Sequence, residues 1–321
     1  MSSDMLSAMF PQVFIDGLTL GFLYAIVALG YTMVYGILEL INFAHGEVFM
    51  VGAFIGTESL LLLEHFGVLS GLNPFIGLLV AIIIAGLISG LLGITIERVA
   101  YRPLRNSPRL ILFISAIGIS FLLQDGVRFT EGLTRNIFYL PVPQLFSGSI
   151  RISENIFLSY KTLIIIALAV IMMVGLQYFV NKTKWGISMR AVAQDQTTAS
   201  LMAINVNKVI ALTFFIGSSL GGATGVLYAQ QYGVIDPYIG FMIGLKAFIA
   251  AVLGGIGNIK GAMLGGILLG LFESFGAAYM GPLTGNAIGA EYKDVFAFTI
   301  LIIVLLFKPE GIIGQVTKEK V

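Results

Sequence analysis

Long apolar runs, separated by short polar connectors, account for most of the chain. Most of these runs approach the ~20 apolar residues that a helix needs to cross the hydrocarbon core of a bilayer. Nine runs can be distinguished, at residues 13–38, 41–63, 75–96, 110–124, 163–180, 209–232, 241–256, 262–280 and 295–307. The pattern predicts an all-α fold, a polytopic bundle of membrane-spanning helices in a single domain that covers residues 1–321.

The number of spans stays open between eight and nine. The first two runs are separated by very little, and the seventh is short and enters a glycine-rich stretch. Either place fits a discontinuous or re-entrant helix. Proline lacks the N–H that a helix interior needs. All nine prolines lie at or near the ends of the runs, from Pro11 to Pro309, and their placement supports these boundaries independently of hydropathy.

Composition excludes a soluble fold, because 57% of the residues are hydrophobic and 11% are charged, against roughly 25% charged residues in soluble domains. Membrane lipid is therefore the first partner that the sequence predicts. The net charge of +1 gives no reason to expect a nucleic acid. The chain has no cysteine, which excludes disulfides and cysteine-ligated metals. The N-terminus lacks the basic stretch of a cleavable signal peptide, so the first run is expected to remain as a span.

Basic residues gather in connectors that fall on one side of a nine-span topology, and cytoplasmic loops carry an excess of such residues. The connector after the third run holds Arg98, Arg102, Arg105 and Arg109. The connector after the fifth holds Lys182, Lys184, Arg190 and Lys208, and the C-terminus holds Lys308, Lys318 and Lys320. We therefore expect the C-terminus in the cytoplasm and the N-terminus outside.

Two longer polar segments interrupt the apolar pattern. Residues 126–161 fall on the predicted outer side and contain the alternating run SIRIS at 149–153, which fits either a small extended cap or a simple connector. Residues 182–208 fall on the predicted cytoplasmic side, and residues 186–207 within them have the composition of one helix with polar flanks. Such a helix either seats in a groove of a soluble partner or lies on the membrane surface as a linker.

Glycine is abundant, at 39 residues, and recurs at four-residue spacing in most of the runs, as in Gly52/Gly56 and Gly266/Gly270. This spacing lines one helix face with small residues and lets neighbouring helices approach closely in lipid. We expect tight packing between helices. Faces of this kind also suit helices that slide against each other, and the sequence leaves both interpretations open.

A polar cluster separates the first two runs. It consists of Glu39, Asn42, His45 and Glu47. Ionisable groups inside a membrane cost about 2.5–3.5 kcal/mol each on insertion scales and usually face a cavity or a partner. The cluster is therefore either an unwound element that lines a path or an ordinary interhelical turn. Two further charges, Lys246 and Glu273, lie inside later runs and either pair with each other or join the cluster.

A catalytic site is hard to build from this sequence. The motif Gly217-Ser-Ser-Leu-Gly221 matches G-x-S-x-G, but it lies in a membrane run instead of a strand–turn–helix. Neither a zinc-hydrolase motif nor a P-loop occurs in the sequence. We therefore expect no enzyme activity, no metal and no cofactor in this chain, and any ATP must be bound by another subunit.

Several motifs, in order along nearly the whole chain, resemble a known family. They are GFLYAIVALGYTMVYG at 21–36, INFAHGE at 41–47, MRAVAQD at 189–195 with LMAIN at 201–205, GGIGN at 254–258 and LFKPEG at 306–311. The chain resembles the permease subunits of bacterial ABC importers for branched-chain amino acids. One position departs from the pattern, because many members of that family have glycine where this chain has Ala203.

The resemblance implies a multi-pass subunit of the bacterial inner membrane that moves branched-chain or related hydrophobic amino acids. Its partners would be a homologous second permease, two cytoplasmic ATPase subunits and a periplasmic substrate-binding protein. We place the translocation path at Asn42, Phe43, His45, Gly46, Glu47, Lys246 and Glu273. We place ATPase coupling within residues 182–208, at Gly186, Arg190, Ala191, Gln194, Asp195, Ala199, Met202 and Asn205.

Three alternatives remain at this stage. A related ABC permease could carry urea or short amides. A self-sufficient secondary transporter or channel could use Glu47, His45 and Lys246 as proton or ion groups. An intramembrane hydrolase acting through Ser219 is more remote, since it needs a histidine nearby in space.

Overall fold

The structure, a computed structural model, describes residues 3–105, 107–153 and 156–314. Each of the nine apolar runs forms a helix. These helices are α1 (Ser3–Leu38), α2 (His45–His65), α3 (Pro74–Ile96), α5 (Arg109–Thr134), α6 (Tyr160–Lys182), α9 (Val206–Tyr232), α10 (Ile239–Gly254), α11 (Ile259–Leu283) and α12 (Lys293–Phe307). Among the described residues, seven helices are long and apolar enough to cross a membrane, whereas α10 and α12 are shorter. The helical membrane bundle is confirmed, and the choice between eight and nine spans stays a prediction.

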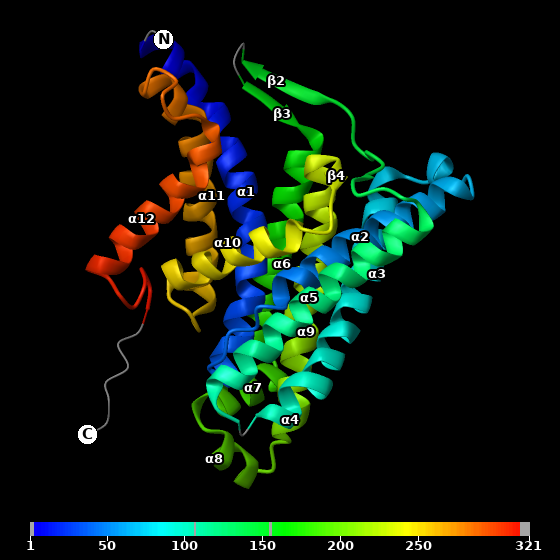
Figure 1. Ribbon diagram of the computed structural model, residues 1–321, viewed down its shortest axis with the longest axis vertical. Coiled ribbons are helices and arrows are strands. Elements are labelled where there is room, and N and C mark those ends of the chain that lie inside the picture. The colour runs from blue at the N-terminus through cyan, green and yellow to red at the C-terminus, as the bar shows by residue number, and fades with distance from the viewer. Residues whose placement is uncertain (1–2, 106, 154–155, 315–321) are drawn as a thin grey trace.

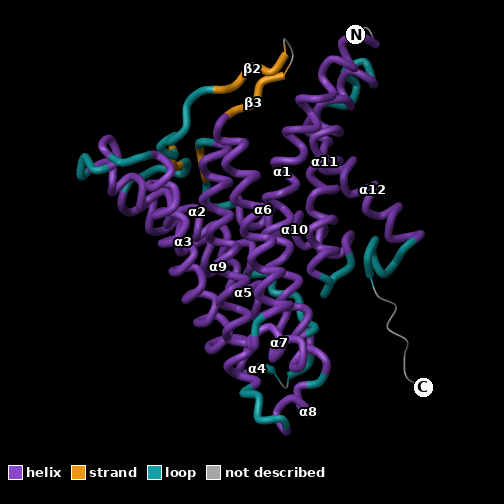
Figure 2. The backbone as a smooth tube through the Cα atoms, turned by 180° about the vertical axis from the view of Figure 1, so that it is seen from behind, coloured by secondary structure: helices purple, strands orange, loops and turns teal. Residues whose placement is uncertain are grey.

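Shorter elements complete the chain at the two ends of the bundle. They are η1 (Leu69–Gly71), the π-helix η2 (Glu97–Tyr101), α4 (Arg102–Leu104), α7 (Lys184–Gln194), α8 (Gln196–Leu201) and η3 (Ala290–Tyr292). In Figure 1 the N-terminus and the strands β2 and β3 lie at one end of the molecule, and α4, α7 and α8 lie at the other. The same separation is visible from behind in Figure 2. Lys318 and Lys320 of the orientation argument lie outside the described residues.

The segment 126–161 is partly helical and partly extended. Helix α5 continues to Thr134, so the first nine residues belong to a helix instead of a loop, and we correct the expected extent of the extended part accordingly. The alternating run forms β2 (Ser149–Ser153), which pairs antiparallel with β3 (Ile156–Ser159). A second pair joins β1 (Leu140–Pro141) to β4 (Val234–Ile235), which ties this segment to the end of α9.

Glycine faces join the central helices, as their spacing predicts. On α1, an added Cβ at Gly21 would lie 2.7 Å from the Cα of Ile267 in α11. At the crossing of α2 and α9, an added Cβ at Gly52 would overlap the backbone of Gly222. The backbones therefore approach as closely as small residues allow, which is how helices gain contact energy in lipid.

Pro11 does not mark the beginning of a span. Helix α1 begins at Ser3 and runs through Pro11, and α11 likewise contains Pro282 near its end. Membrane helices tolerate proline because nearby groups and local adjustments satisfy the carbonyl that loses its partner. The proline rule was therefore wrong at Pro11, and hydropathy alone underestimated the length of α1.

The last two sequence motifs lie against each other. After α12 the chain folds back onto the end of α10, where Ile312 N donates to Leu253 O at 2.9 Å and Ile313 N donates to Gly254 O at 3.0 Å. Asn258, which caps α11, also donates from Nδ2 to Ile313 O at 2.9 Å. These bonds hold the GGIGN turn and the residues after LFKPEG together as one junction.

Candidate functional site

A cavity of about 550 Å³ opens between α1, α2, α5 and α10, beside the break that separates α1 from α2. Most of its wall is aromatic or aliphatic. Its lining residues are Tyr31, Phe43, Glu47, Phe113, Ile117, Ser120, Phe121, Gln124, Tyr238, Phe241, Met242, Gly244 and Leu245. We call this space the α2–α5–α10 pocket. Of the residues in the predicted path, Phe43 and Glu47 are part of its wall.

The break between α1 and α2 is an unwound element of six residues, 39–44. Its first residue, Glu39, has a φ of 52°. Asn42 is buried, and its Oδ1 accepts hydrogen bonds from Ala44 N at 3.2 Å and from the Tyr101 hydroxyl at 2.9 Å. Phe43 stacks edge-on against Phe113 of α5, with ring centroids 5.2 Å apart. The π-helix η2 thus anchors the element, and the element presents Phe43 to the pocket.

Glu47 reaches the pocket because α2 and α10 cross at glycines. An added Cβ at Gly46 would lie 2.8 Å from the Cα of Gly244, and the Glu47 carboxylate lies directly against Gly240. Glu47 is 1% exposed. Its Oε1 accepts a hydrogen bond from the Ser120 hydroxyl at 3.2 Å, while its Oε2 has no hydrogen-bond partner within the described residues.

His45 turns away from the pocket. Its ring lies 4.8 Å from the ring of Tyr31, in a T-shaped arrangement, and contacts Gly30 of α1 and Gly221 of α9. A side chain at Gly30 would overlap the imidazole, so the missing Cβ makes room for it. His45 therefore packs between helices, behind the wall residue Tyr31, and does not itself line the pocket.

Lys246 and Glu273 form a separate buried ion network. Lys246 Nζ lies 2.8 Å from Glu273 Oε1 and 2.7 Å from Asp294 Oδ1, and Lys293 Nζ lies 2.8 Å from Glu273 Oε1. The Tyr24 hydroxyl donates to Glu273 Oε2 at 2.7 Å. The network joins α1, α10, α11 and α12. Neither Lys246 nor Glu273 lines the α2–α5–α10 pocket, although both were placed in the predicted path.

Several wall residues were missed by the sequence analysis. Ser120 and Gln124 stand four residues apart in an apolar run, so they share one helix face. This polar pair was a usable signal. The aromatic residues of the wall, such as Phe113 and Phe241, gave no such signal in the sequence. An apolar residue in an apolar run can face lipid, protein or a cavity, and the sequence does not distinguish these cases.

The polar segment 182–208 forms two short helices, α7 and α8, so the prediction of one helix over 186–207 was wrong. Asp195 interrupts it with extended backbone, φ −162° and ψ 113°, and its carboxylate caps α8 by accepting from Thr197 N at 2.8 Å. The hydrogen bonds from Thr198 and Thr197 hold the pKa of Asp195 below its usual range. Asn205 caps α9 in the same way, accepting from Lys208 N at 3.1 Å. Aspartate competes well for such caps and poorly for helix interiors.

The coupling residues divide into an inner and an outer set. Gly186 and Ala199 are buried and Ala191 is half-buried; Arg190, Gln194, Asp195, Met202 and Asn205 are exposed. Two neighbouring apolar side chains, Leu201 and Met202, are 81% and 74% exposed at the end of α8. Together these two side chains form a small exposed apolar surface at the end of α8.

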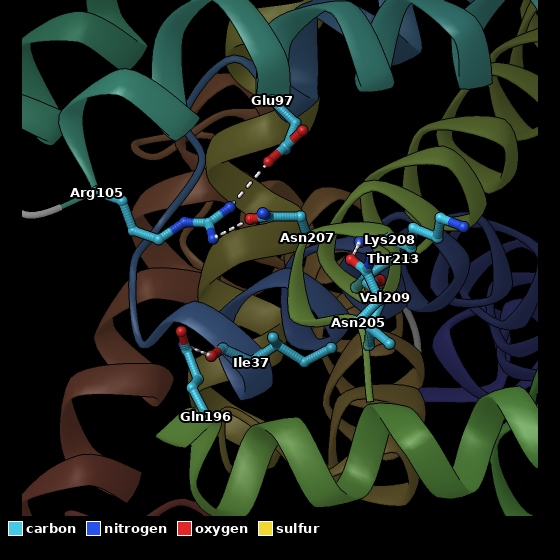
Figure 3. Close-up of polar contacts among 9 residues, drawn as sticks. All are labelled: Ile37, Glu97, Arg105, Gln196, Asn205, Asn207, Lys208, Val209 and Thr213. Atoms are coloured by element: carbon cyan, nitrogen blue, oxygen red, sulfur yellow. Dashed lines mark hydrogen bonds and ion pairs between the residues drawn. The ribbon is translucent and has the colours of Figure 1, made fainter. Parts of the chain in front are cut away.

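Hydrogen bonds connect this segment to the elements beside the pocket (Figure 3). Gln196 Nε2 at the start of α8 donates to Ile37 O in the last turn of α1, at 3.2 Å. Arg105 lies between Glu97 Oε1 and Asn207 Oδ1, each at 2.9 Å, and so joins the end of α3 to the beginning of α9. The unwound element begins two residues after Ile37, so this hydrogen bond links α8 to the helix end that precedes it.

Comparison with known proteins gives concordant matches. A family model described as "Branched-chain amino acid transport system / permease component" matches residues 13–305. The high-affinity branched-chain amino acid transport system permease protein LivH of Salmonella typhimurium is 48% identical over 317 residues, which cover 97% of this chain and 98% of that protein. LivH of Escherichia coli K12 is 47% identical over the same shares.

A third relative agrees. The high-affinity branched-chain amino acid transport system permease protein BraD of Pseudomonas aeruginosa is 45% identical over 314 residues, 97% of each chain. No solved structure matches the chain. The matches extend over the pocket, the unwound element and the α7–α8 segment alike.

Proposed function

The chain belongs to the family of permease components of branched-chain amino acid transport systems, and from this premise we propose that it moves branched-chain amino acids through the α2–α5–α10 pocket, in an importer driven by separate ATPase subunits. The observation that carries the proposal is the pocket itself. Its aromatic and aliphatic wall suits an apolar side chain, and its few polar groups suit the polar end of an amino acid. A permease for urea or short amides fits this wall less well, because such substrates have little apolar surface to bury.

We propose that α7 and α8 dock the ATPase. Leu201 and Met202 offer the exposed apolar surface, and the bond from Gln196 to Ile37 carries movement of α8 to the unwound element. ATP stays on the partner subunits. Nucleotide can switch the permease between states only if the ATPase binds one of them better than the other. A helix pair bonded to the last turn of α1 would present a different surface to the ATPase in each state.

Helix α5 is proposed as the face that meets the second permease. Only 11% of the residues in its most apolar stretch are buried, against 67% of those in the corresponding stretch of α1. Its exposed side is hollowed by a groove of about 860 Å³ that includes Asp125, Arg128 and Gly132. Charged side chains on a spanning helix are costly against lipid. A homologous membrane helix would cover them, and it would also close the pocket on its α5 side.

The proposed orientation follows the basic connectors. It places α4, α7 and α8 in the cytoplasm with the C-terminus, and the N-terminus and the β2–β3 hairpin outside (Figure 1). The periplasmic binding protein would then deliver substrate at the hairpin end. The host membrane is the bacterial inner membrane.

Docking at α8 is tested by placing a charge on its exposed apolar end. Leu201→Glu should lower ATP-driven leucine uptake at least tenfold in proteoliposomes that hold the assembled transporter. The matched control is Leu201→Met, which keeps an apolar side chain at the same exposed position. It should transport normally. Full uptake by Leu201→Glu would refute docking at this surface.

A further inference from the structure

Glu47 is a buried carboxylate that the described part of the chain leaves without a cation. It is 1% exposed, and no lysine or arginine among the described residues forms an ion pair with it. The Ser120 hydroxyl satisfies Oε1 at 3.2 Å, and Oε2 accepts no hydrogen bond from those residues. An isolated buried charge is expensive, so a buried carboxylate either takes up a proton or is paired with a cation. The Glu47 carboxylate is therefore a place for a positively charged group that approaches through the pocket, beside Oε1 and Ser120, because Oε2 itself is enclosed against Gly240.

Glu273, another buried carboxylate of the bundle, shows what a satisfied site looks like. Glu273 receives Lys246, Lys293 and the Tyr24 hydroxyl, so both of its oxygens are bound. Glu47 has one hydroxyl and an adjacent cavity instead. The difference indicates that the partner of Glu47 comes from outside the chain.

The chemistry around Glu47 selects the kind of cation. Among the described residues that line the pocket, Glu47 is the one that carries a formal charge, and the facing wall is made of Phe43, Phe113, Phe241 and Leu245. A hydrated metal ion gains nothing from such a wall. An organic ammonium that carries a branched apolar group satisfies both parts, because its N–H groups reach the carboxylate while the alkyl group removes apolar wall from water.

We propose that Glu47 binds the α-ammonium group of the transported amino acid, and that the aromatic wall of the same pocket holds its branched side chain. The proposal rests on the proposed function and deepens it. It assigns recognition of the amine to the permease itself. Glu47 then acts as a specificity-determining residue that rejects molecules with the same alkyl group and no amine.

The test measures binding in the pocket itself, apart from the selectivity of the binding protein. The chain has no cysteine, so Met242→Cys introduces a single thiol into the pocket wall. The assembled transporter in nanodiscs is labelled with a maleimide, and protection of this chain is titrated with three probes. These are leucine, 3-methylbutylamine, which lacks the carboxylate, and 4-methylpentanoate, which lacks the amine.

Leucine and 3-methylbutylamine should protect the thiol, and 4-methylpentanoate should not. Adding Glu47→Gln should weaken protection by both amines about 10- to 100-fold, the size of one charge-assisted hydrogen-bonding contact. The control Glu64→Gln changes an exposed carboxylate on the same helix and should leave protection unaltered. A second thiol, Phe66→Cys, lies outside the pocket and should label at the same rate with every probe.

The outcomes separate this proposal from the proposed function. If leucine protects the thiol equally well with and without the Glu47→Gln change, or if 4-methylpentanoate protects it as well as the amines do, Glu47 does not bind the ammonium group. If leucine protects nothing in the pocket while ATP-driven uptake continues, the pocket is not the substrate site and the proposed function fails at that point. Protection that depends on both the amine and Glu47 supports the assignment.

Discussion

Replacing Lys246 with methionine should destabilise the folded chain severely while leaving the pocket wall untouched. The side chain of Lys246 is 7% exposed and that of Glu273 is 2% exposed. Lys246 and Lys293 balance Glu273 and Asp294, so the four charges sum to zero. Without Lys246, two carboxylates share one cation, and Lys293 is 40% exposed and contacts Glu273 alone.

The expected cost is about 3–5 kcal/mol, the range found when one partner of a buried ion pair is removed. Replacing both partners of a buried pair by apolar residues is often close to neutral. Here it removes the two most buried charges and leaves Asp294 and Lys293, whose side chains are 26% and 40% exposed to solvent. The double variant Lys246→Met with Glu273→Leu should therefore recover most of the lost stability. The pair is too close for additivity, so a double-mutant cycle isolates the interaction.

The assay is denaturation of the purified transporter in mixed micelles, followed by circular dichroism, together with leucine uptake by the same variants. The reasoning predicts an unstable single variant and a double variant that is stable and active. A single variant that loses less than about 1 kcal/mol would refute the structural role. A double variant that is stable but unable to transport would indicate that Lys246 and Glu273 belong to the translocation path after all.

Three further outcomes follow from local geometry. Ala203 has a φ of 64°, a backbone conformation that costs a residue other than glycine roughly 1–2 kcal/mol. Ala203→Gly should therefore stabilise the fold by about 0.5–1 kcal/mol, once the larger entropy that glycine loses on folding is subtracted. The same denaturation experiment measures this change. Gly52→Ala should prevent α2 from packing against α9, because the added Cβ would overlap the backbone of Gly222. Gly175→Ala, where the added Cβ has no neighbour within 4 Å, should fold normally. A stability assay in detergent compares the two variants. The pKa of Asp195 lies below its ordinary value of 3.8. The carboxylate that caps α8 is therefore ionised above pH 3.8, and its stabilising effect is lost as the pH falls through the lowered pKa. The NMR shift of the Thr197 amide, which donates to this carboxylate, should follow the titration, and Asp195→Asn should abolish that pH dependence.

The sequence alone predicted the helical bundle and part of the pocket wall. Hydrophobic runs located all nine helices, and the cost of charge in lipid pointed to the element around Glu47. It could not separate His45 from Glu47. Two residues apart on a helix, their side chains point about 160° apart. One therefore packs between α1 and α9 while the other faces the cavity.

Other features depended on contacts between distant segments. Lys246 and Glu273 stand 27 positions apart, and their pairing with α12 requires the fold. The break at Asp195 is local, but hydropathy does not predict it. The Asp195 side chain can either lie on the surface of one continuous helix or cap a new helix, and both arrangements have the same hydropathy. Ala203 was noticed only through the family resemblance, and the structure gives the physical reason, a left-handed backbone that glycine adopts freely.

The measurement that tests the central claim most directly is uptake of labelled leucine into proteoliposomes that hold this chain with its partner permease and ATPase subunits. It is made with and without the binding protein, and with and without ATP at the ATPase face. The account predicts uptake that needs both. Uptake by this chain alone, driven by an ion gradient, would contradict it and would transfer the mechanism to the buried charges of the bundle.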